Sequence, residues 1–384
     1  MKLNSILIIA IVVFTGFTSC KTNPGKNDNL VSSLLLSPDH FDTIVNGSKV
    51  ELFTLQNPSG ITVQLTNYGA SIVSVITPDK DGHFADITLG YKDISGYLTD
   101  NMNLGCIVGP YANRIGKGLF TVDGITYQLE VNDNGVNTLH SGKNAFSKKV
   151  WTATQDENTV TMVYDAQDME AGFPGNIKAT AVYTLTPDNK LELKISAVTD
   201  KKTVINLTNH AYFNLGGEGS GSITGHQIQI LADAITPVDS ALIPTGDFMP
   251  VDNTPFDLRN PVLIGDGIDK TENQQIVFGK GFDHNWVLNN KSGQLALAVR
   301  LSDPDSKRFL ELSTNQPGLQ FYSGNFMNGT VTGKSGKLYN FRNALALEPQ
   351  FFPDSPNQPN FPSTILEPGK TYEHITVYSF GVME

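Results

Sequence analysis

Short runs of apolar and β-branched residues, joined in pairs by turn signals, recur from about Lys49 to the end of the 384-residue chain. Asp123-Gly124 is the sharpest turn signal, because both central positions of a tight hairpin turn need a positive φ. No long segment shows the 3.6-residue repeat of an amphipathic helix. The pattern predicts an all-β protein built as a large antiparallel β-sandwich. The runs that we expect to be strands are 51–55, 61–65, 119–122, 125–129, 179–185, 191–195, 295–301, 309–312 and 372–380.

Two long segments do not follow the strand pattern. Residues 209–225 are rich in glycine, residues 344–362 are rich in proline, and both segments contain asparagine and aromatic residues. Long irregular segments on a β scaffold are where binding and catalytic residues are commonly placed. We therefore expect both segments to be loops that contribute to a functional site.

The first twenty residues have the features of an export signal. Lys2 is followed by a mostly apolar stretch from residue 6 to 17, and then by Thr18, Ser19 and Cys20. This order is typical of a secretory signal peptide, and the stretch is too short for a comfortable membrane span. The last four residues, Phe17 to Cys20, resemble a bacterial lipobox, which implies cleavage before Cys20 and acylation of that residue. Ordinary secretion with an incidental cysteine is the alternative.

These features predict three parts in the chain. Residues 1–19 are expected to be a lipoprotein signal peptide, 20–45 a flexible lipid-anchored tether, and 46–384 a single β-sandwich domain. The expected location is the bacterial cell envelope, as a periplasmic or outer-membrane lipoprotein. Cys106 is the only other cysteine, and the apolar run around it favours buried packing over a nucleophile.

The charge balance excludes one class of partner. The formal net charge is −11, and no run of lysine or arginine stands out. A nucleic-acid-binding protein normally has a basic total or a basic patch, so we expect no nucleic-acid partner. An acidic surface is typical of a soluble protein with neutral ligands. We expect a monomer that contacts a membrane only through its lipid.

Glu348 and His210 are the candidates for proton transfer. Glu348 follows the apolar run 344–347, and a strand in a sandwich core would place it at a strand end as a general base or in a structural ion pair. His210 lies among asparagine and aromatic residues, where it is either a structural histidine or a general acid with a pKa near neutrality. When each residue is considered alone, a structural ion pair is the simpler interpretation of Glu348, and a structural histidine is the simpler interpretation of His210.

Other polar residues in turn-rich segments are candidates for ligand binding. His140, before Ser141-Gly142, is placed to orient a hydroxyl group. Asn113 and Arg114 either donate hydrogen bonds to a ligand or brace a loop. Asp283 either accepts hydrogen bonds or caps a turn.

Metal and cofactor signals are absent from the sequence. The seven histidines are scattered and show no zinc-ligand spacing. There is no glycine-rich dinucleotide fingerprint, no Walker loop and no Gly-x-Ser-x-Gly elbow. We therefore expect neither a metal nor a cofactor.

Taken together, the segments resemble the aldose 1-epimerase (galactose mutarotase) family over nearly the whole domain. The resemblance rests on motifs that occur in the family's order: Asn67 to Ile72, Asn113-Arg114-Ile115, Thr138-Leu139-His140, Thr208 to Leu215, Phe282-Asp283, Gln316 to Tyr322 and Leu347 to Gln350. The chain departs from the family pattern at Pro110, where arginine is common, and at Ser141, where glycine is common. Neither departure removes a proton-transfer group.

The resemblance implies a galactose mutarotase-like supersandwich with an open sugar cleft. It implies a cofactor-independent enzyme that interconverts the α and β anomers of free aldohexoses such as galactose and glucose. Glu348 would be the general base and His210 the general acid. The residues that would bind the sugar are Asn113, Arg114, His140, Tyr212, Asp283 and Gln320. Two alternatives stay open, a non-catalytic sugar-binding lipoprotein and a glycoside hydrolase that uses Glu348 and Asp283.

Overall fold

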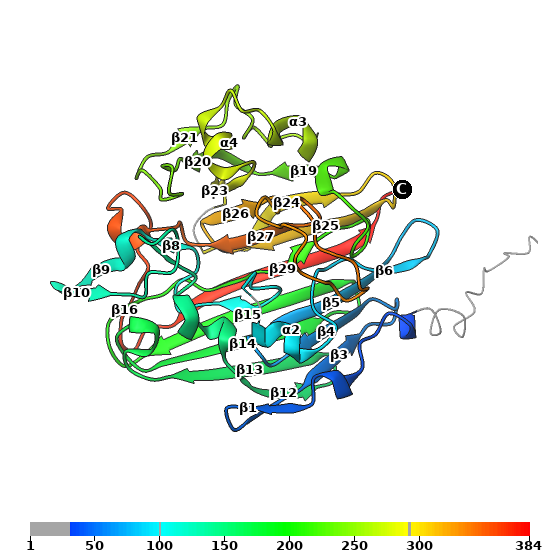
Figure 1. Ribbon diagram of the computed structural model, residues 1–384, viewed down its shortest axis with the longest axis horizontal. Helices are drawn as coiled ribbons and strands as arrows, with labels where there is room; N and C mark the ends of the chain where they lie inside the picture. Colours follow the sequence, from blue (N-terminus) through cyan, green and yellow to red (C-terminus); the bar gives the residue numbers. More distant parts are fainter. Residues whose placement is uncertain (1–30, 100, 291–292) are drawn as a thin grey trace, which may run out of the picture.

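Antiparallel β-sheets form most of the molecule, as expected from the sequence. The computed structural model describes residues 31–99, 101–290 and 293–384 (Figure 1). The largest sheet has nine strands in the order β12 (Thr152–Asp156), β13 (Thr159–Ala166), β14 (Ile177–Leu185), β15 (Lys190–Thr199), β29 (Tyr372–Val382), β25 (Arg308–Thr314), β24 (Ala296–Ser302), β19 (Gln227–Ile230) and β22 (Val262–Leu263).

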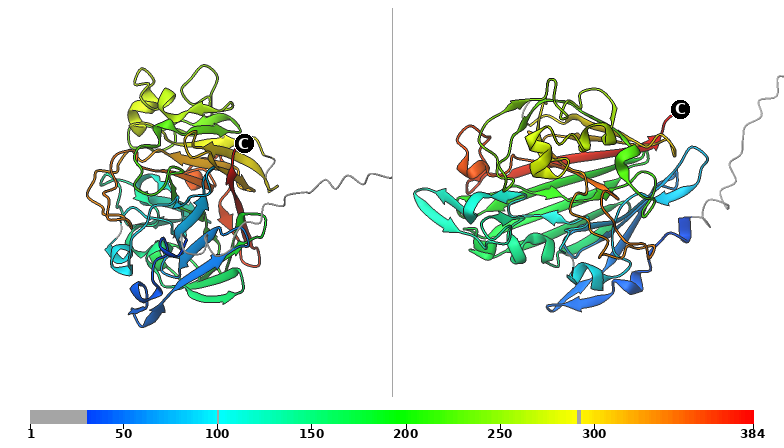
Figure 2. Two further views of the ribbon diagram at one scale, coloured as in Figure 1. Left: turned by 90° about the vertical axis from the view of Figure 1, so that its right-hand side faces the viewer. Right: turned by 45° about the horizontal axis from the view of Figure 1, so that its top comes forward.

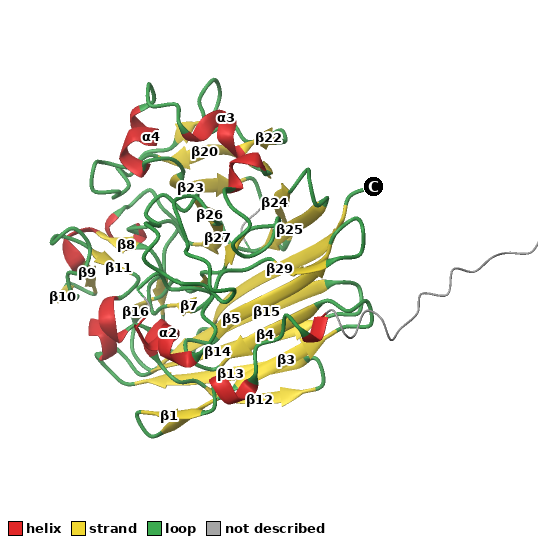
Figure 3. Ribbon diagram, turned by 45° about the vertical axis from the view of Figure 1, so that its right-hand side comes forward, coloured by secondary structure: helices red, strands yellow, loops and turns green. Residues whose placement is uncertain are grey.

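A second sheet of six strands lies beside it and carries the candidate site. Its order is β18 (Tyr212–Phe213), β27 (Leu345–Gln350), β26 (Gly318–Tyr322), β23 (Asp283–Leu288), β20 (Ala232–Thr236) and β21 (Met249–Pro250). Figure 3 shows β26 and β27 above β29 of the larger sheet. A four-stranded sheet at the N-terminal end contains β3 (Leu52–Gln56), β4 (Thr62–Thr66), β5 (Ser71–Pro78) and β6 (Phe84–Asp86).

The remaining elements are short. The described residues also form five two-stranded pairs: β1 (Thr43–Val45) with β2 (Ser48–Val50), β7 (Ile107–Val108) with β17 (Thr208–Asn209), β8 (Arg114–Ile115) with β11 (Thr138–Leu139), β9 (Leu119–Val122) with β10 (Ile125–Gln128), and β16 (Thr203–Val204) with β28 (Ile365–Leu366). The helices are α2 (Ile94–Thr99), α3 (Ile264–Ile268), α4 (Gln274–Gly279) and the 3-10 turns η1 (Pro38–His40), η2 (Gly116–Gly118), η3 (Gly142–Asn144), η4 (Phe146–Lys148), η5 (Glu170–Gly172), η6 (Ile223–Gly225) and η7 (Ser355–Asn357). Among the described residues, no helix has the length and apolar character needed to cross a membrane.

Alternating side chains on the strands build the core. In β14 the residues from Ile177 to Leu185 are buried at every second position, which is the two-residue period of a strand with one face inward. One cluster of buried apolar side chains extends from Leu55 to Phe380 and includes residues of both large sheets. The all-β sandwich prediction is confirmed. Figure 2 shows α3 and α4 at the end of the molecule opposite the N-terminal strands.

The Asp123-Gly124 prediction is confirmed in detail. Val122 pairs with Ile125 across the turn that joins β9 and β10. Asp123 and Gly124 have φ angles of 51° and 78°. A two-residue turn with positive φ at both positions matches the right-handed twist of the strands on either side.

The prediction that residues 344–362 form a loop is wrong for its first part. Leu345–Gln350 forms β27, which is buried along its whole length and pairs with β26 and β18. Pro349 does not interrupt this strand. Its carbonyl accepts a hydrogen bond from Thr208 Oγ1 at 2.7 Å, on the side away from β26, so its missing N–H removes no bond to β26.

The tether expected over residues 20–45 ends earlier than its boundary at residue 45. Pro38–His40 forms η1, Thr43–Val45 forms β1, and Phe41 is fully buried against the N-terminal sheet. Residues 1–30, with the expected signal peptide and Cys20, lie outside the described residues. Cys106 is a buried free thiol, as expected.

Candidate active site

The candidate site is built on one face of the six-stranded sheet. Strand register places Gln320 of β26 directly opposite Glu348 of β27, and Asp283 of β23 opposite Tyr322 of β26. Because side chains alternate across a strand, the residues between them point the other way. Those residues belong to the hydrophobic core: Trp286, Leu319, Phe321 and Leu347. The packing of one face therefore fixes the polar residues on the other.

A cavity of about 430 Å³ opens over this polar face. Its walls come from segments that are far apart in the sequence, including the paired strands β8 and β11 and the loop between β26 and β27. The cavity brings together every predicted catalytic and sugar-binding residue except Gln320, and these residues are Asn113, Arg114, His140, His210, Tyr212, Asp283 and Glu348. Gln320 lies directly behind the cavity wall and donates a hydrogen bond from Nε2 to Asp283 Oδ1 at 2.7 Å.

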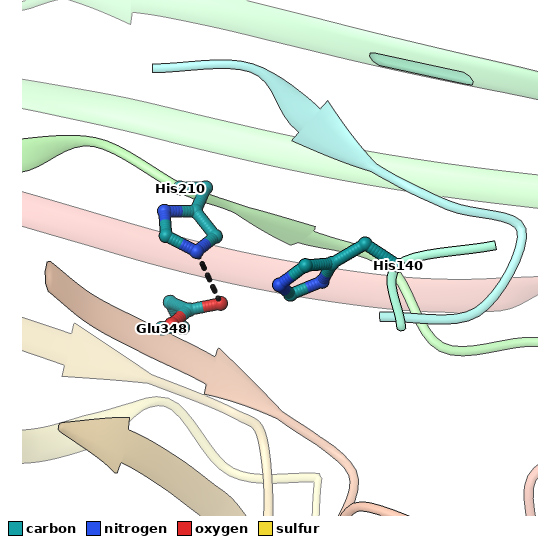
Figure 4. Close-up of side chains that lie close together, drawn as sticks. All are labelled: His140, His210 and Glu348. Carbon is teal, nitrogen blue, oxygen red and sulfur yellow. Dashed lines mark ion pairs between the residues drawn. The ribbon is translucent and has the colours of Figure 1, made fainter. Parts of the chain in front are cut away.

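Glu348 and His210 face each other across the base of the cavity. His210 Nε2 lies 3.5 Å from Glu348 Oε2, and the two residues are 5% and 2% exposed (Figure 4). Glu348 is delivered by the middle of β27 and not by a strand end as expected. His210 lies between the short strands β17 and β18. These two groups were expected to form the acid–base pair, and the fold places them within reach of one small ligand.

Burial shifts the two pKa values in opposite directions. Desolvation of the carboxylate raises the pKa of Glu348 well above its usual value, and the charge of Asp283 adds to this effect. The guanidinium of Arg114 acts against it. Desolvation of the imidazolium lowers the pKa of His210 to about 4. Between these values the pair holds one proton, which is the protonation level that a paired acid and base require.

A reciprocal pair of hydrogen bonds fixes His140. Its backbone N–H donates to the Asn113 carbonyl, and the Asn113 N–H donates to His140 Nδ1, each at 3.1 Å. Both residues hold left-handed backbone angles, with φ of 53° for His140 and 67° for Asn113. Because Nδ1 is an acceptor, the neutral ring carries its hydrogen on Nε2. His140 therefore offers a donor to the ligand.

The same tautomer argues against a metal at this place. Donor atoms of His140, His210 and Glu348 all lie within 4.8 Å of one another, which is a set of ligand types suited to a transition metal. A histidine ligand must offer a lone pair, and the Nε2 of His140 carries a hydrogen. The Arg114 charge nearby also disfavours a cation. The arrangement fits a neutral, hydroxyl-bearing ligand better.

Asp133 is a cavity residue that the sequence analysis missed. Its Oδ2 accepts a hydrogen bond from Arg114 Nε at 2.9 Å, and both side chains are largely buried. An isolated aspartate before an Asn-Gly turn gives no local sign that it pairs with an arginine of another strand. The aromatic wall formed by Tyr322 and Phe326 was also missed, because these residues read as an ordinary strand end and loop.

Tyr212 contributes its ring more than its hydroxyl group. The ring centroid lies 5.0 Å from that of His210, and the hydroxyl donates to the Met102 carbonyl at 3.2 Å. The ring therefore lies against the acid–base pair and limits the access of water to it.

Comparison with known proteins agrees with this geometry. The family model described as aldose 1-epimerase matches residues 51–379. The chain belongs to the aldose 1-epimerase family. The resemblance seen in the sequence is thus confirmed, and with it the expectation of a carbohydrate epimerase with a galactose mutarotase-like fold.

Relatives of this family match the chain over most of its length. The galactose mutarotase of Bos taurus is 41% identical over 341 residues, which are 89% of this chain and 97% of the bovine protein. The aldose 1-epimerase of Escherichia coli (strain K12) is 38% identical over 338 residues, covering 87% and 96% of the two chains. The crystal structure of a GalM/aldose epimerase homologue from C. elegans has a TM-score of 0.80 at 29% identity, covering 87% of this chain and all of that one.

Proposed function

We propose that this cavity interconverts the α and β anomers of free aldohexoses such as galactose and glucose, with Glu348 as general base and His210 as general acid. The observation that carries the proposal is the buried pair itself, with His210 Nε2 and Glu348 Oε2 separated by 3.5 Å at the base of a sugar-sized cavity. Its family membership agrees, and the names of its relatives include galactose mutarotase and aldose 1-epimerase.

Ring opening needs one proton removed and one proton added. Glu348 takes the proton from the C1 hydroxyl group while His210 protonates the ring oxygen, which breaks the bond between C1 and that oxygen. The aldehyde rotates about the C1–C2 bond, and the ring closes on the other face of C1 with the two roles reversed. Each positioned group contributes about 10²–10⁴-fold to the rate. Proton transfers suffice, so the mechanism uses no metal or nucleotide.

The opposed pKa shifts suit this cycle. The unliganded pair holds its single proton on Glu348, and the ring-opening step starts with that proton on His210. The two arrangements have the same total charge but differ in where it lies. The first is an uncharged pair, and the second is a carboxylate and an imidazolium, which stabilise each other because Glu348 Oε2 and His210 Nε2 are 3.5 Å apart. Ring opening and ring closure need opposite roles of Glu348 and His210, so the pair must be able to hold its proton on either residue.

The remaining polar groups hold the sugar while C1 turns. Arg114 and His140 donate hydrogen bonds, and Asp283 accepts them while Gln320 holds its carboxylate in place. Asn113 fixes the His140 ring and the start of β8. A grip on hydroxyl groups distant from C1 leaves C1 free to rotate, and the ring of Tyr212 covers an apolar edge of the sugar.

Exchange spectroscopy tests this function directly. The anomeric protons of glucose give separate NMR signals, and an active enzyme at micromolar concentration transfers magnetisation between them. Absence of exchange for galactose, glucose and other free aldoses would leave the sugar-binding alternative. Release of reducing sugar from oligosaccharides would favour the glycoside hydrolase alternative, which the comparisons do not favour.

We also propose that the mature protein begins at Cys20 and is lipid-anchored in the bacterial cell envelope, and that it acts as a monomer. The export pattern of residues 1–20 supports the anchor. All the residues that line the cavity belong to one chain, which is consistent with a monomer. Mass spectrometry of the mature N-terminus tests the anchor, with Cys20→Ala expected to release the protein from membranes. Sedimentation equilibrium of the domain tests the monomer.

A further inference from the structure

The side chain of Arg114 is paired with the carboxylate of Asp133, which is neither of the carboxylates of the proposed sugar site. The backbone carbonyl of Arg114 accepts a hydrogen bond from the Asp354 N–H at 2.8 Å, so the main chain is fixed. Within the described part of the protein the side chain makes one hydrogen bond, from Nε to Asp133 Oδ2 at 2.9 Å. Its two Nη groups have no hydrogen-bond partner among the described residues, and they belong to a side chain that lines the cavity.

Asp133 is itself held rigidly. Its backbone N–H donates to the Asn137 carbonyl at 3.0 Å, and the Asn137 N–H donates back at 2.9 Å. Between them Asn134 and Gly135 form a turn with φ of 51° and 68°. The Asn137 side chain accepts from the Lys117 N–H at 2.9 Å, which attaches this turn to the segment that follows β8. These bonds hold the backbone of Asp133, and the Asn134 side chain donates to its Oδ1 at 3.3 Å, which leaves Oδ2 for Arg114.

We propose that Asp133 is a positioning residue of the epimerase reaction, which holds Arg114 through Nε so that both Nη groups face the sugar. A guanidinium is planar, and fixing Nε sets the direction of its remaining donors. Without this contact the long side chain has several rotamers. Ordering it would then cost conformational entropy when the sugar binds, which weakens the affinity. This inference rests on the proposed function, because it assigns Arg114 to sugar binding.

Asp133 also balances the charge of the cavity. Arg114 lowers the pKa values of Glu348 and Asp283, whereas Asp133 raises that of Asp283. Removing the Asp133 charge while keeping its shape leaves the Arg114 charge uncompensated. The charged and titratable groups that line the cavity are Asp133, Arg114, His140, His210, Asp283, Glu348, Tyr212, Tyr322 and Tyr339.

Two substitutions separate orientation from charge. In Asp133→Ala the anchor is lost, and we expect KM for galactose to rise about tenfold to a hundredfold, with a smaller change in kcat. In Asp133→Asn the amide oxygen still accepts from Nε, and we expect kcat/KM near pH 7 to stay within about tenfold of wild type. The alkaline limb of its pH profile should move to lower pH, because the uncompensated charge of Arg114 lowers the pKa of Glu348.

Asp257→Ala is the matched control. Asp257 also accepts hydrogen bonds from an arginine, Arg259, but it does not line the cavity. We expect unchanged kinetics for this variant. A wild-type KM in Asp133→Ala would overturn the positioning role, and an unmoved alkaline limb in Asp133→Asn would overturn the charge balance. If the alanine variant does not fold, Asp133→Ser replaces it, because its shorter side chain does not reach Arg114 Nε, and a wild-type KM in that variant would overturn the proposal.

Binding measurements separate this inference from the proposed function. Calorimetric titration of galactose into wild type and Asp133→Ala reports the role of Arg114 without turnover. An inactive wild-type enzyme would refute the proposed function, whereas equal galactose affinity in an active wild type and Asp133→Ala would refute the positioning role alone.

Discussion

Replacing Glu348 by glutamine removes the base and keeps the shape of the site. Glu348 is 2% exposed and lies opposite Gln320 in the sheet, so an amide of the same size fits with little rearrangement. Loss of one positioned base is expected to lower kcat by about 10²–10⁴-fold. At about 1.4 kcal/mol for each factor of ten, this corresponds to roughly 2.8–5.6 kcal/mol of transition-state stabilisation.

The assay is polarimetry of freshly dissolved α-D-galactose, with the spontaneous rate in buffer subtracted. Galactose binding should stay within about tenfold of wild type, because Arg114, His140 and Asp283 still hold the other hydroxyl groups. Glu373→Gln is the control, since Glu373 is an exposed strand residue of β29 far from the cavity lining. A Glu348→Gln variant with more than a tenth of wild-type kcat would refute the assignment of Glu348 as base.

The same variant carries a stability signature. The pKa of Glu348 is raised in the folded protein, so its contribution to stability is present below the unfolded pKa and is lost as pH rises through the folded pKa. Above that pH the native state holds a buried charge, and glutamine removes it. We expect Glu348→Gln to raise the free energy of unfolding by about 0.5–2 kcal/mol at a pH above that folded pKa. An unchanged or lower melting temperature would show that the carboxylate is well solvated.

Three further outcomes follow from the site. Arg114→Lys keeps the charge but loses the planar fork, so KM for galactose should rise by roughly tenfold to a hundredfold in initial-rate assays. The pH profile of kcat/KM should be bell-shaped, falling on the acid side near the lowered pKa of His210, about 4, and on the alkaline side at the raised pKa of Glu348. Burial also lowers the pKa values of His210, His226, His284 and His374. The stability that these histidines contribute is present above about pH 6.5 and is lost as pH falls toward 4. Urea unfolding should therefore give a lower free energy of unfolding at pH 4.5 than at pH 7.

Local patterns in the sequence predicted much of the fold. The Asp123-Gly124 hairpin and the alternating run of β14 were predicted because a turn and a two-residue period are properties of neighbouring residues. The order of strands was not predictable, because β29 at the C-terminus inserts between β15 and β25. That pairing depends on which faces bury most apolar area in the whole molecule.

Local reasoning failed where a distant contact decides the conformation. β27 was taken for a loop because Pro349 lies in it and further prolines follow it closely. Only the contact with Thr208 shows why Pro349 is tolerated. β1 was assigned to a tether because a three-residue strand has no local signal, and it forms beside the buried Phe41.

The candidate site was predictable in its members and not in their geometry. The proton-transfer pair of Glu348 and His210 came from the family resemblance, and the fold brings the two together. Asp133 was missed because its significance depends entirely on the position of Arg114. A residue that acts through another side chain leaves no motif of its own.

Polarimetry of freshly dissolved α-D-galactose and α-D-glucose with catalytic amounts of the wild-type domain tests the central claim most directly. Optical rotation should reach its equilibrium value much faster than in buffer, at a rate proportional to enzyme concentration. A rotation curve that stays at the buffer rate for both sugars, with folded protein present, would contradict it.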